Sequence, residues 1–184
     1  MPYSPRRSSV HRQGFSLVEV LITVLVLVVA LTAFIRSLTG TVQLGRANRE
    51  TAQAMDGARG AIEELYAADF AQVYALYNTN ADHDPAGAPG PNFTVTPLGP
   101  QAGDADGMVG EIRFPTVGLG PALELREDLV DEDLGMPRDL NGDTAVDGLE
   151  HSADYRFLPV EVRVRWQGRS GAKEVALKTV LVNR

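Results

Sequence analysis

The longest run of apolar positions lies close to the N-terminus. From Val20 to Leu31 only Thr23 interrupts the apolar side chains, and the stretch from Phe15 to Ile35 has the length of a helix that crosses ~30 Å of hydrocarbon. Glu19 lies one helical turn inside this stretch. An ionised carboxylate in a spanning helix costs about 3 kcal/mol on insertion scales and normally implies a partner of opposite charge. The pattern predicts a membrane-spanning helix over 15–36 that carries one acid.

Helical periodicity continues past this segment, but its character changes. Small or apolar side chains recur every three or four residues, while charged side chains occupy the other faces. We therefore expect one helix from Phe15 to Asp69, with 37–70 as an amphipathic continuation packed against a globular head. The recurring positions are Ala47, Thr51, Ala54, Ala58, Ile62 and Leu65.

Beyond the helix, the period changes to that of strands separated by turns. The clearest pair is Leu158 to Trp166 and Lys173 to Val182, which alternates and predicts a hairpin. One face of it should pack on the helix, and the other should face water or a neighbour. The exposed stripe is expected to hold Arg163, Arg165, Glu174 and Lys178. Shorter strands are expected at Asn92–Thr96, Met108–Val117 and Leu123–Leu125, so that 71–184 forms a β-rich head and the fold class is α+β.

The residues around the start of the apolar run read RQGFSLVEV, and they resemble the type IV prepilin signature shared by pilins and by the pseudopilins of type II secretion. The resemblance implies a cleaved basic leader over 1–14, cut between Gly14 and Phe15 by a prepilin peptidase. It also implies methylation of Phe15 and places Glu19 fifth in the mature chain. The helix followed by an antiparallel meander resembles the pilin fold.

Physical chemistry gives the same residues a role. Cleavage after Gly14 would create a positive amine on Phe15, about one turn or ~6 Å along the axis from Glu19. The two charges can neutralise each other within one chain, or the amine of one subunit can pair with Glu19 of another. The resemblance favours the second arrangement. A secretory signal peptide or a plain signal anchor is the alternative, but no small-residue cleavage motif of the expected kind follows between Ala33 and Gly45.

Charge changes the expected partners. The chain has 17 basic and 24 acidic residues, and without the three arginines of the leader 14 basic residues remain, so the net charge goes from −7 to −10. Such a surface argues against direct nucleic-acid binding. The expected partners are other pilin or pseudopilin subunits, the prepilin peptidase and the inner membrane, crossed once with the head in the periplasm or on the cell surface. There is no cysteine, so no disulfide braces the head.

One loop has the spacing of a calcium site. Oxygen donors occur at positions 1, 3, 5, 9 and 12 of the segment 139–150, and a carbonyl is available at position 7, as in EF-hand or dockerin-type loops. Thr144 stands where glycine usually permits the sharp turn. We expect a structural Ca²⁺ site, and the resemblance to pseudopilins, some of which use calcium in this way, favours it. The alternative is a solvated turn whose side chains cap their own backbone. The ligands would be Asp139, Asn141, Asp143, Ala145, Asp147 and Glu150.

Catalysis finds no support in the sequence. The three histidines, His11, His83 and His151, stand apart from one another, and the last two fall in Asp-rich loops where an exposed polar role is expected. We therefore do not expect an enzyme, and the resemblance to prepilins implies a structural subunit of a type IV pilus or a type II secretion pseudopilus. The head resembles minor pilins of the type IV pilus modification class, while the choice among pilus, secretion and DNA-uptake systems stays open. The alternative function is a membrane-anchored periplasmic calcium-dependent binding domain that does not assemble.

Overall fold

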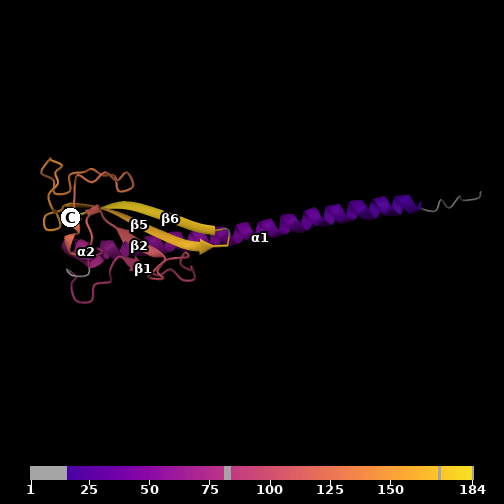
Figure 1. The fold of residues 1–184 in the computed structure, drawn as a ribbon, viewed down its shortest axis with the longest axis horizontal. Helices are drawn as coiled ribbons and strands as arrows, with labels where there is room; N and C mark the ends of the chain where they lie inside the picture. The colour runs from indigo at the N-terminus through magenta and orange to yellow at the C-terminus, as the bar shows by residue number, and fades with distance from the viewer. Residues whose placement is uncertain (1–15, 81–83, 170, 184) are drawn as a thin grey trace, which may run out of the picture. The chain divides into compact units, whose positions relative to one another are not determined.

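The structure is a computed structural model that describes residues 16–80, 84–169 and 171–183. The long helix α1 spans Leu17–Ala67 and a short helix α2 spans Phe70–Tyr77, followed by the strands of the head (Figure 1). The chain divides into two compact units, Met1–Gly45 and Arg46–Arg184, which are described separately.

The part of α1 in the first unit presents its apolar side chains outward. Every large apolar side chain from Leu17 to Leu44 is between 51% and 79% exposed. Threonine hydroxyls within this segment donate to carbonyl oxygens four residues earlier, so Thr23 bonds to Glu19 O at 2.7 Å and Thr32 to Val28 O at 2.7 Å. These bonds remove polar groups from the helix surface, which suits a segment made for an apolar environment.

The part of α1 in the second unit buries one face. Ala54, Ala58, Ala61 and Leu65 are at most 7% exposed and recur at the spacing of a single helix face. Gly57 lies on the same stretch, and a Cβ built there would lie 2.6 Å from a methyl carbon of Val95. The small side chains therefore allow α1 to approach the head closely, as the predicted amphipathic pattern requires.

The second helix was not predicted from the sequence, which indicated a β-rich head directly after Asp69. Asp69 has an extended backbone, and its carboxylate accepts a hydrogen bond from the Ala71 amide at 3.2 Å. This N-cap ends one helix and starts the next within two residues. The new helix buries Val73, Tyr74 and Tyr77 in the core of the head.

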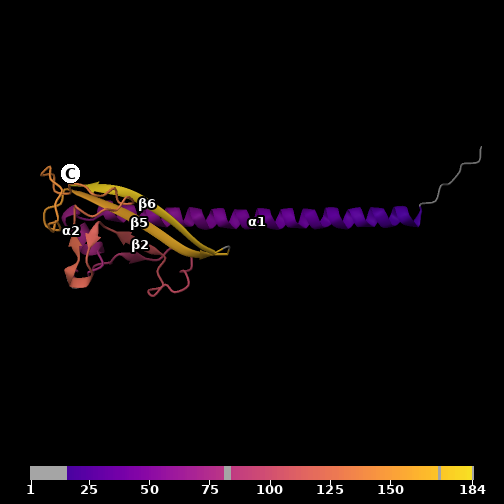
Figure 2. The ribbon, with the colours of Figure 1, turned by 45° about the horizontal axis from the view of Figure 1, so that its top comes forward.

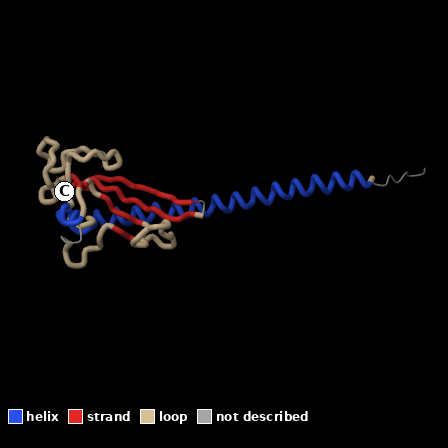
Figure 3. The backbone as a smooth tube through the Cα atoms, in the orientation of Figure 1, coloured by secondary structure: helices blue, strands red, loops and turns tan. Residues whose placement is uncertain are grey.

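The head is built on one antiparallel sheet with the strand order β1-β2-β5-β6 (Figure 3). The pairing of β5 with β6 runs from Phe157 opposite Val182 to Gly168 opposite Gly171, so the predicted hairpin is confirmed and is longer than its pattern. The α+β, pilin-like class is also confirmed. The sheet strands are Asn92–Phe93 (β1), Gly110–Arg113 (β2), Phe157–Gly168 (β5) and Gly171–Val182 (β6).

All three shorter predicted strands are trimmed or divided by the structure, and the one expected at Asn92–Thr96 keeps only Asn92–Phe93. The segment 108–117 forms β2 and then, after Pro115, a separate strand β3 at Thr116–Val117. That strand pairs with β4 at Glu124–Leu125 in a two-stranded ribbon, with a 3₁₀ turn at Gly120–Ala122 between them. Proline lacks the N–H that continues a ladder, which is why the predicted strand stops there.

One face of β5 forms the core against α1. Val160, Val162, Val164 and Trp166 are at most 2% exposed, and they point to the same side of the strand. The indole Nε1 of Trp166 donates to the Glu50 carboxylate at 3.4 Å. Figures 1 and 2 show the last part of α1 running along this sheet.

The opposite face of β5 is less open than the sequence indicated. Glu161 is 1% exposed and accepts from Arg113 Nη1 at 2.6 Å and Arg163 Nη2 at 2.9 Å. Arg113 also approaches Asp131, which lies on the loop after β4. The side chain of Arg163 is only 19% exposed because it pairs with Glu161 and Glu174, so it is less open than its predicted place in a solvent-facing stripe indicated. The other predicted members, Arg165, Glu174 and Lys178, stay about half exposed.

Candidate functional site

The first candidate site is the N-terminal junction. Ser16 caps α1: its hydroxyl accepts from the Val18 amide at 3.2 Å, and its carbonyl accepts from the Val20 amide at 3.1 Å. Glu19 lies in the first turn of the helix and is exposed. Its carboxylate forms no hydrogen bond or ion pair with the residues that the structure describes. The predicted processing residues Gly14 and Phe15 lie outside the described residues.

The second candidate site is the segment between β4 and β5, and its second half, residues 139–156, is called the acidic loop below. Leu140 is fully buried, and its carbonyl accepts from the amides of Arg156 and Phe157 at 2.7 and 2.9 Å. These two bonds close the loop at its base. Tyr155 holds the far side by donating its hydroxyl to Phe70 O at 2.6 Å, so α2 supports the loop.

The first three predicted calcium ligands lie together. Asp139 accepts from the amides of Gly142 and Thr144, and Asp143 Oδ1 accepts from the Ala145 amide at 2.8 Å. Asn141 Oδ1 accepts from the Asp143 amide at 3.0 Å, and its Nδ2 lies 3.3 Å from Asp143 Oδ2. Partial burial opposes ionisation of Asp139, but the amides of the turn hold its pKa below the usual range.

Thr144 has a φ of 76°, in the left-handed region that favours glycine. It stands at the sixth position of the predicted loop, where calcium loops of this spacing turn sharply. The backbone therefore makes the sharp turn despite the side chain.

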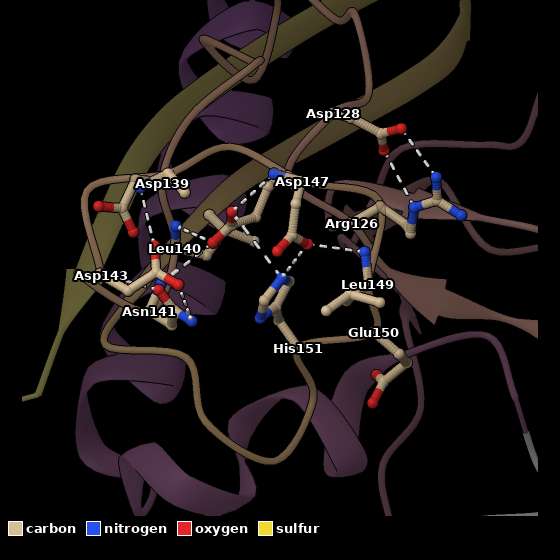
Figure 4. A network of polar contacts seen from close by, with 12 residues as sticks. Arg126, Asp128, Asp139, Leu140, Asn141, Asp143, Asp147, Leu149, Glu150 and His151 are labelled. Atoms are coloured by element: carbon tan, nitrogen blue, oxygen red, sulfur yellow. Dashed lines mark hydrogen bonds and ion pairs between the residues drawn. The ribbon is translucent and has the colours of Figure 1, made fainter.

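The remaining predicted ligands are dispersed. Asp147 turns its carboxylate to His151, and Glu150 points away from the first three ligands and accepts from the Ser152 amide at 2.8 Å (Figure 4). Ala145 is exposed. Asp154 is not among the predicted ligands, but its Oδ2 lies 3.3 Å from Asn141 Nδ2. The structure thus brings together Asp139, Asn141 and Asp143 and does not bring Glu150 to them.

Glu127 lies under the acidic loop and holds it from below. Its side chain is 1% exposed, and Oε1 accepts from the amides of Leu140 and Asn141 at 2.6 and 3.2 Å. Oε2 accepts from the Asp147 amide at 3.3 Å. One buried carboxylate therefore satisfies three amides of a segment that has no strand partner at these positions.

The environment of His151 also differs from the prediction. It is 3% exposed, so its predicted place as an exposed polar residue is wrong. Nε2 lies 3.2 Å from Asp147 Oδ1 and 3.8 Å from Glu127 Oε2, and Nδ1 lies 3.1 Å from Asp154 Oδ1. Burial opposes the charged imidazolium, but the hydrogen bonds to Asp147 and Asp154 and the charge of Glu127 raise the pKa of His151.

Strand alternation carries a signal that would have found Glu127. Leu125 is fully buried, and Glu127 follows it by two residues, hence on the same side of the extended chain. Arg126 and Asp128 point to the other side, where they pair with each other at 2.7 Å. His151 has no such local signal, because its burial depends on Glu127, which is distant in sequence.

Comparison with known families finds a match at the N-terminal junction. A family model described as the prokaryotic N-terminal methylation motif matches residues 10–35, which include the leader end, Glu19 and most of the apolar run. This motif is the hallmark of type IV prepilins and pseudopilins. The N-terminal segment of this chain therefore carries the motif of type IV pilin-like proteins. No curated protein and no solved structure matches it.

The match bears on the geometry of the N-terminal junction. Such proteins are processed by a prepilin peptidase, and the family is structural and not enzymatic. Helix α1 is long and apolar enough to cross a membrane by length and composition, which suits anchoring of a pilin-type protein.

Proposed function

We propose that the chain is a minor pilin or pseudopilin that is cut between Gly14 and Phe15, methylated on Phe15, and assembled into a filament of the type IV pilus or type II secretion class. The methylation motif is the observation that carries this proposal. The apolar surface of α1 from Leu17 to Leu44 supports it, because a single chain leaves that surface exposed and both a bilayer and a bundle of like helices would cover it.

Glu19 has a specific part in this proposal. Its carboxylate has no partner among the described residues, and cleavage after Gly14 supplies an amine four residues earlier in each subunit. Pairing between the amine of one subunit and Glu19 of another would remove both charges from the apolar phase only when the helices are in register. The acid then favours entry of a correctly placed subunit.

Mass spectrometry of the N-terminus tests processing. The chain purified from cells that contain a prepilin peptidase should begin at methylated Phe15, and Gly14→Leu should leave the leader attached. Gln13→Ala is the matched control and should be processed normally. A chain that still begins at Met1, or one that begins near Gly45, would contradict the proposal and favour the anchored domain that does not assemble.

A second variant separates assembly from processing. Glu19→Gln should be cleaved and methylated normally but should be depleted from sheared filaments, whereas Ser16→Ala should be incorporated as in the parent. Incorporation of Glu19→Gln at the parental level would contradict the charge pairing. Loss of surface pili or loss of protein secretion on deletion of the gene distinguishes the two filament classes.

We also propose that the acidic loop holds a structural calcium ion through Asp139, Asn141 and Asp143. Hard oxygen donors at alternate positions and the left-handed turn at Thr144 support this assignment. Calcium should raise the melting temperature of the full chain in detergent micelles, and Asp143→Ala should abolish that increase. Asp128→Asn is the matched control because Asp128 pairs with Arg126 outside the loop. Equal melting with calcium and with a chelator would leave the loop as a plain turn.

Glu150 and Asp154 provide a sharper version of this test. The spacing predicts Glu150 as the twelfth-position ligand, whereas the structure brings the Asp154 carboxylate near Asn141. Loss of the calcium response in Glu150→Ala would mean that the loop closes around the ion, and loss in Asp154→Ala alone would assign the last position to Asp154.

A further inference from the structure

A second group of side chains that could hold a metal ion shares Asp147 with the predicted calcium ligands but differs from them in chemistry. Glu127, Asp147 and His151 each offer one ligand atom, and the three atoms all lie within 4.8 Å of one another. Unlike the alternating oxygen donors of the acidic loop, this group contains an imidazole and is largely buried.

The spacing of these atoms is close to that of a zinc site. Ligands ~2.0 to 2.2 Å from a tetrahedral zinc ion lie roughly 3.3 Å apart. His151 Nε2 is 3.2 Å from Asp147 Oδ1 and 3.8 Å from Glu127 Oε2. The distance from His151 to Glu127 and the distance between the two carboxylates have to shorten for all three atoms to reach one ion.

The surroundings orient each ligand. Asp154 Oδ1 lies 3.1 Å from the other ring nitrogen of His151, the arrangement that fixes the tautomer and orientation of metal-bound imidazoles. Asp147 Oδ1 is held by the Leu149 amide at 2.8 Å, and Glu127 is held by three backbone amides. The His151 backbone is fixed in turn, because its amide donates to Leu125 O at 3.0 Å.

The group is accessible to solvent from one side, and its ligands come from two segments of the head. The Asp147 side chain is 38% exposed, whereas Glu127 and His151 are at most 4% exposed, so solvent reaches the group from the Asp147 side. Glu127 follows β4, and the other two ligands belong to the acidic loop. A metal ion would therefore join the loop to the ribbon in a chain that has no cysteine.

We propose that Glu127, Asp147 and His151 form a structural site for a divalent transition metal of the zinc class, distinct from the calcium site proposed at Asp139, Asn141 and Asp143. A nitrogen ligand with two carboxylates suits Zn²⁺, whereas Ca²⁺ prefers oxygen ligands alone. Water completes the coordination from the open side. The site does not depend on filament assembly, so its test and that of the proposed function are independent.

Zinc titration of the full chain in detergent micelles tests the site. After treatment with a chelator, the parent should bind one Zn²⁺ per chain in competition with a chromophoric chelator, and excess Ca²⁺ should not displace it. His151→Gln should weaken binding by more than tenfold, and Asp154→Asn by on the order of tenfold through the lost orientation of the ring. Glu150→Gln is the matched control and should bind as the parent does.

Two results would overturn the proposal: absence of saturable Zn²⁺ binding by the parent, and unchanged affinity in His151→Gln. Displacement of zinc by calcium would also overturn it by assigning the ion to the calcium loop. If the emission of the buried Trp166 shows that His151→Gln is unfolded, the Co²⁺-loaded parent decides. Intense visible absorption bands of a low-coordinate ion with a nitrogen ligand support the site, and the weak spectrum of hexacoordinate, all-oxygen Co²⁺ contradicts it.

Discussion

The apolar side chains in the two parts of α1 have opposite surroundings. From Leu17 to Leu44 the large apolar side chains are exposed, whereas Ala54, Ala58, Ala61 and Leu65 are buried in the head. The head covers its share of the helix with its own sheet and loops. Among the described residues of its own unit the first part has no such cover, so another phase or another molecule that covered it would gain free energy from its apolar surface.

The acids of the two regions differ in the same way. Glu127 is buried in the head, and three backbone amides donate to it. Glu19 has no hydrogen-bond partner among the described residues. A buried charge is stable only when it is paired, so Glu127 has its partners within the head, whereas under the proposed function Glu19 gains a partner only after processing and assembly.

Removal of one leucine from each region should give the largest contrast. Leu65→Ala deletes a side chain that is 1% exposed and should lower the free energy of unfolding of the head by about 2 to 5 kcal/mol. Leu27→Ala, in the exposed part of α1, should leave it unchanged. Urea denaturation of the full chain in micelles, followed by the fluorescence of the single tryptophan Trp166, measures both. Equal losses would show that the first part of α1 also stabilises the head.

A charge introduced into the exposed part of α1 should weaken membrane insertion and leave the head unchanged. Val28→Arg should make membrane insertion less favourable by about 3 kcal/mol because it places a cation near the centre of the apolar segment. The emission of Trp166 should not change. Extraction of membranes with alkaline carbonate measures the fraction that stays inserted, with Val28→Leu as the control. Full retention of Val28→Arg in the membrane would argue that this segment does not span it.

Replacement of the buried acid by its amide tests how far the head depends on paired charge. Glu127→Gln keeps the shape but directs an amide toward backbone donors, and it should cost about 1 to 3 kcal/mol of unfolding free energy. Asp128→Asn, at the exposed neighbour, should change it by less than about 0.5 kcal/mol. Urea denaturation gives both values, and a neutral Glu127→Gln would mean that the amides find other partners.

The smallest expected effect concerns one backbone angle of the acidic loop. Thr144→Gly should raise the unfolding free energy by about 0.5 to 1 kcal/mol, because glycine adopts a positive φ without the strain of a β-carbon. Thr144→Ala keeps the β-carbon and should give no such gain. Thermal melting of both variants makes the comparison, and an equal gain in the two would assign the effect to the threonine hydroxyl or methyl group.

Elements with a strong local pattern could be predicted, and those that depend on distant partners could not. The long helix and the final hairpin follow from periodicity extended over many residues. Helix α2 was missed because its eight residues are too few to give a clear period, and its start depends on the cap at Asp69. The burial of Glu161 was missed because its partner Arg113 lies on β2, which is distant in sequence.

The sequence by itself determined the N-terminal junction, since the basic leader, Gly14, Phe15, Glu19 and the apolar run are adjacent and their meaning depends on order and spacing alone. It also determined the α+β class. Only the tertiary structure decided which polar residues of the head act together. Glu127 and His151 meet because the acidic loop folds back over the end of β4, and the same fold turns Asp147 toward them and Glu150 away from the first calcium ligands. Such contacts depend on how distant segments pack, a property that no local spacing contains.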